Sequence, residues 1–268
     1  MVNGVDIQES NRRFDSGAEV ALADFLDRYF YAYLKDYGYR WQRERGRDDQ
    51  LLGIDGRLFY GEDVKNIDEK GAFHFFNSHL NTFAFELSSI QRCGEVDGWF
   101  VNEDTKTDYY LIVWPNGRCS IPGGERGWLD SCIRTRNKRI LDFRDFTVVT
   151  AMLISRNKLV EKIESYGWDL QRLRRKAFEI RRNYAPGEKI KSGVDDFCFI
   201  FSRDKKDGGD YGYVEKPINL VVKKRLLHSI AKGVYLISED GVGVIKDDFI
   251  LERQGFRIYE KRMKEPNS

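Results

Sequence analysis

The stretch GIDGRLFYGEDVKNIDEKGA, residues 53–72, sets acidic side chains inside two runs of apolar and β-favouring residues. Strands are depleted in carboxylates, so these acids need an explanation. Gly61 and Glu62 lie between the two runs, and glycine at the first position of a two-residue loop favours the type II′ turn of a β-hairpin. The stretch therefore predicts two antiparallel strands joined at Gly61.

This turn fixes which residues of the two strands lie opposite each other. Tyr60 falls opposite Asp63, and further from the turn Asp55 falls opposite Asp68. Opposed residues point to the same side of a sheet, with Cβ atoms about 5 Å apart. Lys70 shares that side because it lies two places after Asp68 on the same strand. We therefore expect Asp55, Asp68 and Lys70 to form one patch.

The predicted patch has the chemistry of a cation site. Like charges directly opposite each other destabilise a sheet, and a bound divalent cation removes the repulsion. Mg²⁺ usually takes one or two carboxylates and keeps several waters. A neighbouring lysine stabilises charge that develops on a phosphate. The alternative is a solvated hairpin in which Lys70 simply pairs with Asp68, because charge runs usually mark exposed faces.

These residues resemble the motif of the PD-(D/E)xK nuclease superfamily, which has the restriction-endonuclease-like fold. The motif is an Asp, a gap, then Asp or Glu, any residue and Lys. Asp55 matches the first acid, Asp68 the second and Lys70 the lysine. The resemblance covers about residues 16–115, and it reaches 166 if TAMLISRNKLVEKI supplies the later strand and helix. Ile54 stands where the family usually has Pro, and Asp68 where Glu is commoner.

The resemblance implies a divalent-metal-dependent endonuclease that cleaves DNA, with Mg²⁺ or Mn²⁺ as its cofactor. Asp55 and Asp68 would hold the metal, and Lys70 would lie near the attacking water. Glu86, on a later predicted strand, is either a third metal acid or an outward-facing charge. Many members add an acid from the first helix, for which this chain offers Glu19, Asp24 and Asp27.

Hydrophobic periodicity predicts an α/β fold with a mixed central β-sheet flanked by helices. The first helix is expected over residues 17–35, with a capping box formed by Ser16 and Glu19, and a basic connector follows it. A second helix begins after Ser155 and ends at Gly167. Strands are expected at 82–90, 108–114 and 146–155 and in the last third of the chain, and a strongly basic helix at 170–183.

The chain shows no internal repeat and no linker rich in Pro or Ser. We therefore expect a single compact domain over residues 1–268. The resemblance divides it into a nuclease core at about 16–166 and an accessory α+β region at about 167–268.

The composition indicates a globular protein. The chain has 268 residues, 41% hydrophobic and 14% aromatic, which is enough to bury a real core. Lys and Arg number 45 against 43 Asp and Glu. This near balance excludes a globally basic DNA coat but allows a local basic cleft.

The cysteines, the histidines and the hydropathy of the chain exclude several classes of protein. The four cysteines include no CxxC pair, and His74 and His79 are five apart rather than four, so neither a disulfide scaffold nor a zinc site is indicated. No run reaches the roughly 18 apolar residues of a membrane span. We expect a cytoplasmic protein with reduced thiols and no membrane association.

Two basic stretches are candidates for phosphate contacts, which need Lys and Arg whatever sequence is read. They contribute Arg134 and Arg136 from RTRNKR, and Arg172, Arg175 and Lys176 from QRLRRKAFEIRR. The alternative for the second stretch is a solvated helix face. DNA is the expected partner. A homodimer is a further expectation, since cutting two strands needs two sites.

Three other functions remain open. The same site would serve RNA, because nothing in the sequence reads a 2′-hydroxyl. The chain could instead be a non-catalytic nucleic-acid-binding or interaction module that keeps the nuclease fold. The third is a structural protein with a charged hairpin.

Overall fold

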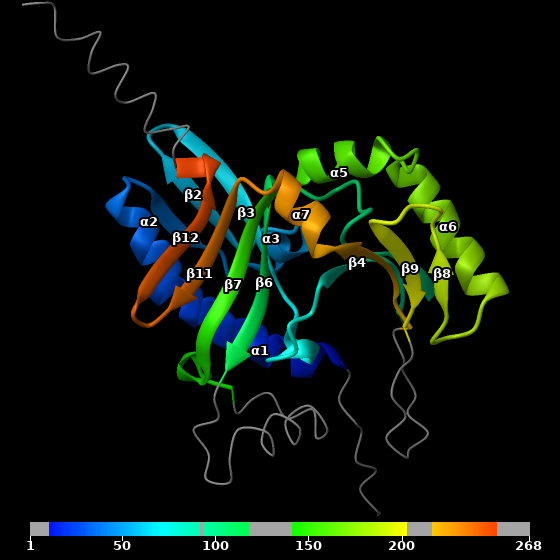
Figure 1. The fold of residues 1–268 in the computed structure, drawn as a ribbon, viewed down its shortest axis with the longest axis horizontal. Coiled ribbons are helices and arrows are strands. Elements are labelled where there is room, and N and C mark those ends of the chain that lie inside the picture. Colours follow the sequence, from blue (N-terminus) through cyan, green and yellow to red (C-terminus); the bar gives the residue numbers. More distant parts are fainter. Residues whose placement is uncertain (1–10, 92–93, 118–140, 203–215, 251–268) are drawn as a thin grey trace, which may run out of the picture.

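The computed structural model describes residues 11–91, 94–117, 141–202 and 216–250, which form two β-sheets with helices around them (Figure 1). Helices and strands alternate along the chain. The mixed α/β class and the mixed central sheet expected from the sequence are confirmed.

The larger sheet has seven strands in the order β1-β2-β3-β6-β7-β11-β12. Neighbouring strands pair antiparallel, except β3 and β6, which are parallel. Its strands are β1 (Arg40–Arg43), β2 (Gly56–Tyr60), β3 (Asp63–Gly71), β6 (Tyr109–Gly117), β7 (Phe146–Ser155), β11 (Gly233–Ser238) and β12 (Gly241–Asp247).

The smaller sheet has five strands in the order β5-β4-β10-β9-β8, all antiparallel to their neighbours. It joins β4 from the first third of the chain to three strands that come more than a hundred residues later. The strands are β4 (Thr82–Gln91), β5 (Gly94–Asp97), β8 (Lys189–Lys191), β9 (Phe197–Phe201) and β10 (Ile218–Lys223).

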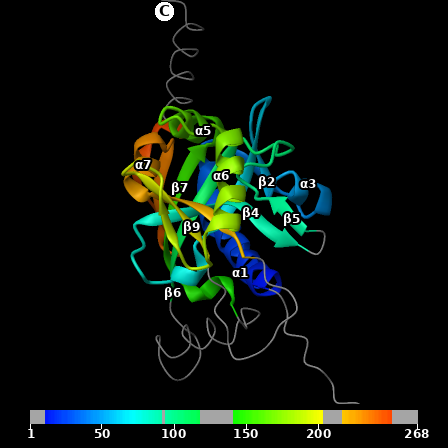
Figure 2. The same ribbon diagram turned by 90° about the vertical axis from the view of Figure 1, so that its right-hand side faces the viewer.

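Helices lie on both sides of the larger sheet (Figures 1 and 2). One long helical run packs along it, made of α1 (Asn11–Leu26), a π-helical turn (Asp27–Tyr31) and α2 (Ala32–Asp36). On the other side lie α5 (Arg156–Glu164), α6 (Leu170–Asn183) and α7 (Lys224–Ile230). Short helices are α3 (Arg47–Leu51), η2 (Phe73–Phe75) and η4 (Phe143–Asp145).

Two hydrophobic cores result, and β6 contributes to both. Leu111 and Val113 lie in the core beneath α1. Tyr110 and Ile112 point the other way, into a core shared with the smaller sheet and with α5, α6 and α7. Alternation along a fully buried strand explains the unbroken apolar run in the sequence.

Several local predictions are confirmed. β7 spans Phe146–Ser155 as expected, and the basic helix α6 spans Leu170–Asn183. The Ser155 side chain accepts a hydrogen bond from the Lys158 N–H at the start of α5.

The start of the first helix was predicted wrongly. The helix begins at Asn11, so Ser16 lies inside it and is not its cap. The basic connector after it contains β1 and α3, which the sequence analysis did not predict. β5 and β8 were also missed, because three- and four-residue strands carry too few alternations to detect.

Strands after residue 167 belong to both sheets. β11 pairs with β7 in the larger sheet, and β10 pairs with β4 in the smaller one. Strands of the C-terminal region therefore pair with strands of the proposed nuclease core in both sheets. Among the described residues, no helix combines the length and apolar character needed to cross a bilayer.

Candidate functional site

The predicted hairpin and its register are confirmed. Tyr60 pairs with Asp63, and Leu58 with Lys65. Gly61 has φ of 61°, and Glu62 is not among the residues with positive φ. A positive φ at the first turn position alone is the pattern of a type II′ turn. The turn therefore sets the register of the whole hairpin.

Asp55 lies just before β2, outside the paired residues of the hairpin, so the predicted pairing of Asp55 with Asp68 is not part of the observed register. Its backbone N–H donates to the Ile67 carbonyl at 2.9 Å. Its side-chain Oδ2 accepts a 2.7 Å hydrogen bond from the backbone N–H of Glu69. Asp55 is thus fixed against β3 by both its backbone and its carboxylate, next to Asp68.

Two threonines form hydrogen bonds with the backbone of the loop that precedes Asp55. Thr107 Oγ1 donates to the Gly53 carbonyl at 2.7 Å, and Thr105 Oγ1 donates to Leu52 at 3.1 Å. Gly53 has φ of 70°, and a Cβ there would lie 2.6 Å from Thr107 Oγ1. Glycine is therefore required at this position, two residues before Asp55. The sequence analysis named neither threonine.

Asp68 and Lys70 form a close ion pair at the centre of the patch. Lys70 Nζ lies 2.6 Å from Asp68 Oδ1, and the side chains are 26% and 4% exposed. Burial raises the pKa of the Asp68 carboxyl well above its ordinary value. The Asp55 charge adds to that rise, and Lys70 opposes it. Burial lowers the pKa of Lys70, but Asp68 and Asp55 outweigh that effect and raise it overall. Lys70 is therefore an ammonium at neutral pH.

Aromatic side chains surround the ion pair on this face. Lys70 Nζ lies 5.1 Å from the centre of the Trp99 ring. Asp68 is level with Tyr110 of β6 in the parallel pairing. Burial raises the pKa of Tyr110, and the Asp68 charge adds to it. The side chain of Arg156 interacts with Tyr110 and opposes that rise.

Glu69 points to the opposite face, as expected, and has a structural role there. Arg43 contacts both of its carboxylate oxygens at 3.0 Å, and Tyr31 donates to it at 2.7 Å. Arg43 also binds both oxygens of Asp27. This buried network ties β1 and the π-helical turn to the strand that carries Asp68.

Within the group of Asp55, Asp68 and Lys70, the two aspartates are the residues that could serve as carboxylate ligands of a divalent cation. Two carboxylates accompany one ammonium, so the trio carries a net negative charge when all three ionise. The described part of the chain contains no cluster of three His, Cys, Asp or Glu placed to hold a metal. The site therefore offers two carboxylates, a number that Mg²⁺ commonly uses together with waters.

Glu86 does not join this pair. Phe83, Phe85 and Leu87 of β4 are buried in the shared core, and Glu86 alternates to the other face of the strand. It lies opposite Asn219 of β10. This position supports the alternative in which Glu86 is an outward-facing charge and not a third metal acid.

The charge of Glu19 is the smallest of the contributions that raise the pKa of Lys70, and its helix α1 packs on the Leu111 face of the larger sheet, whereas Lys70 lies level with Ile112 on the opposite face. Asp27 is engaged by Arg43 and by the Trp41 indole, which donates to it at 2.8 Å. Asp24 is exposed.

The predicted phosphate-binding residues of α6 are partly engaged within the protein. Arg172 donates to the Gly167 carbonyl at 2.6 Å and lies over the Trp168 ring, and Lys176 pairs with Glu179 at 2.7 Å. Arg175 is exposed. Arg134 and Arg136 lie outside the described residues.

Comparison of the chain with protein-family models, with curated proteins and with solved structures finds no match. A function for the chain is therefore inferred from the geometry of Asp55, Asp68 and Lys70 and from the motif that they resemble.

Proposed function

We propose that this chain is a divalent-metal-dependent endonuclease that hydrolyses DNA phosphodiester bonds, with Asp55, Asp68 and Lys70 as its catalytic group. The observation that carries the proposal is the convergence of a buried carboxylate, a second carboxylate and an ammonium on one side of a hairpin. Two carboxylates placed close together repel each other, and groups with pKa values perturbed in this way cluster at functional sites.

Asp55 and Asp68 are the residues that would hold Mg²⁺ or Mn²⁺. The metal would supply Lewis-acid polarisation of the phosphate and a lowered pKa for a bound water. Trp99 and the burial of Asp68 keep the site in a low-dielectric setting, where charge interactions are strong.

Lys70 has a role that follows from its protonation. As an ammonium it can donate to a phosphate oxygen or orient a water, but it has no lone pair with which to accept a proton. In the hydrolysis, water attacks phosphorus, one phosphorus–oxygen ester bond breaks, and the leaving oxygen takes up a proton. Lys70 would stabilise the negative charge that grows on the phosphoryl oxygens.

Cleavage of supercoiled plasmid in Mg²⁺, with an EDTA control, tests the proposal. We expect nicked or linear products with the wild type, and a loss of at least roughly 100-fold in rate for Asp68→Asn and for Lys70→Met. Glu62→Gln, an exposed acid at the hairpin tip, is the matched control and should retain full activity. Wild-type protein that leaves plasmid intact at every metal concentration, or variants that cleave normally, would contradict the assignment.

A second candidate is a non-catalytic nucleic-acid-binding module with the same fold. The closed 2.6 Å pair between Lys70 and Asp68 favours it, because each charge already has a partner. Binding of the same DNA in EDTA without any cleavage in Mg²⁺ would support this candidate. Cleavage of single-stranded or duplex RNA in a parallel lane would identify an RNA-directed nuclease.

A further inference from the structure

The smaller sheet has one face that helices and strands cover and one face open to solvent. The covered face carries Phe85, Phe199 and Leu220, all in the shared core. Positions that alternate with these, from Thr82 to Glu86 of β4 and along β8, β9 and β10, are half-buried or exposed. We call this second side the outer face.

Three lysines lie on the outer face: Lys189 and Lys191 of β8, and Lys223 of β10. Lys189 pairs with Ile200 and Lys191 with Cys198, and opposed residues share a face. Lys189 and Lys223 both lower the pKa of Cys198, against the larger upward effect of its burial, so they lie near it from two sides. The three lysines are exposed and form no ion pair within the described part of the chain. Glu86 shares this face, and Asp196 lies close to Lys223, whose backbone N–H donates to the Asp196 carbonyl at 2.8 Å.

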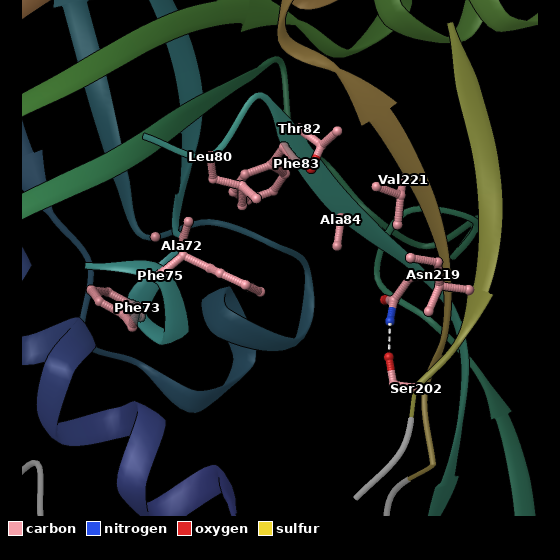
Figure 3. A pocket seen from close by; sticks show the side chains of 12 residues that line it. Ala72, Phe73, Phe75, Leu80, Thr82, Phe83, Ala84, Ser202, Asn219 and Val221 are labelled. Atoms are coloured by element: carbon pink, nitrogen blue, oxygen red, sulfur yellow. Dashed lines mark hydrogen bonds between the residues drawn. The ribbon is translucent and has the colours of Figure 1, made fainter. Parts of the chain in front are cut away.

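A cavity of about 360 Å³ adjoins the lysines on the same face. Figure 3 shows Phe75 of η2 on one side of it and Asn219 and Ser202 on the other. The walls are mainly apolar. Asn219 Nδ2 donates to Ser202 Oγ at 2.9 Å, which places an amide group at the edge of the cavity. Phe75 is 49% exposed although it is large and apolar.

These features match a nucleobase better than a purely apolar ligand. An exposed aromatic ring offers a stacking surface, and an amide offers one donor and one acceptor to a base edge. The volume lies at the small end of ligand pockets, which run from roughly 300 to 1,000 Å³. The lysines supply charges for the phosphates on either side of the base.

We propose that the outer face of the smaller sheet binds an unpaired nucleic-acid strand, with one base in the Phe75–Asn219 cavity. A base within a duplex is stacked on both sides, so it cannot enter a recessed cavity without being extruded. The cavity therefore selects single-stranded or locally opened substrate. The proposal deepens the proposed function, on which it rests for the class of ligand, but it does not require cleavage.

The cavity is linked to the candidate active site through β3. Gly71, which follows Lys70 on the strand, and Ala72 both line it. The chain then turns into η2, which carries Phe75. A strand held on the outer face is therefore anchored by the same segment that presents Lys70.

Fluorescence anisotropy with labelled 12-nucleotide oligothymidylate and oligouridylate, in EDTA and over a series of salt concentrations, tests the proposal. We expect both to bind more tightly than a duplex of equal length. Neutralising Lys189, Lys191 and Lys223 to Gln together should reduce the magnitude of the salt slope by about two, because each phosphate contact to a single strand contributes roughly 0.7. Phe75→Ala should weaken binding by roughly 5- to 150-fold, the value of one stacked base.

Two controls make the result specific. Phe178 on α6 is 47% exposed and lies outside the cavity, so Phe178→Ala should leave binding unchanged. The Arg172, Arg175 and Lys176 to Gln variant removes the same number of charges from α6 and should change the salt slope less. No binding by wild type, preference for duplex, or equal effects of the two phenylalanine variants would overturn the proposal.

A cleavage assay distinguishes failure of the proposed nuclease activity from failure of the proposed single-strand binding. Single-strand binding by the outer face without cleavage in Mg²⁺ upholds this inference and contradicts the nuclease. Cleavage that is unaffected by the lysine and Phe75 variants upholds the nuclease and overturns this inference.

Discussion

At the scale of single residues, Asp68 is the group whose environment is most informative. Its carboxyl is buried, and burial together with Asp55 raises its pKa although Lys70 pulls it down. A carboxyl whose folded-state pKa is raised binds its proton more tightly in the folded chain than in the unfolded one. Ionisation of Asp68 therefore lowers stability as the pH rises from about 4 through the raised pKa. A cation bound at neutral pH would offset that cost.

The pH dependence of cation binding follows from the same shift. Binding needs the ionised carboxylate, so protons compete for Asp68 at pH values well above 4, and the affinity should fall up to tenfold per pH unit below the raised pKa. Titration with Mn²⁺ followed by electron paramagnetic resonance between pH 4.5 and 8 measures this. Lys70→Met removes the charge that holds the pKa down, so its midpoint should lie at higher pH. A flat profile, or an identical midpoint in Lys70→Met, would contradict the assigned coupling.

The sequence was sufficient to predict the group of Asp55, Asp68 and Lys70 because each inference used residues close together in the chain. The Gly61 turn set the register, and alternation placed Lys70 beside Asp68. It did not reach Trp99 or Thr107, which come to the site from a segment about forty residues further along. Their positions depend on the parallel pairing of β3 with β6, which no turn chemistry specifies.

At the scale of elements, β1 and the π-helical turn hold β3, the strand of Asp68 and Lys70, from the face opposite to these two side chains. Arg43 binds Asp27 and Glu69, and its side chain is only 13% exposed. The RWQR sequence of β1 looked like a basic connector because two of its four residues are arginines and a third is the polar Gln42. The structure shows that one of those charges is buried and paired. Composition does not predict burial when the partner lies on another element.

Removing Arg43 should therefore destabilise the fold. Arg43→Met leaves Asp27 and Glu69 without their partner, and breaking a buried pair in this way costs about 3 kcal/mol of unfolding free energy. Urea unfolding monitored by circular dichroism measures the change. Lys158→Met breaks an exposed pair with Glu161, and its cost should stay within about 0.5 kcal/mol. Equal stabilities of the two variants would show that the network contributes nothing.

At the scale of the whole molecule, two sheets share one core, and each draws strands from both ends of the chain. Strands were expected in the last third of the chain, and β9, β10, β11 and β12 lie there, although β8 was missed. Their partners were not predicted. Pairing between β4 and β10 spans more than a hundred residues, and neither periodicity nor capping carries information over that distance.

We propose that the hairpin and the surrounding strands place Asp55 and Asp68 so that they bind a divalent cation beside Lys70. Crystals soaked in Mn²⁺ and measured for anomalous scattering test that claim most directly. We expect one peak within about 2.0–2.2 Å of carboxylate oxygens of both Asp55 and Asp68, and no peak there in Asp68→Asn crystals. A wild-type map with no peak between the two aspartates, at Mn²⁺ concentrations that support cleavage by the protein, would contradict it.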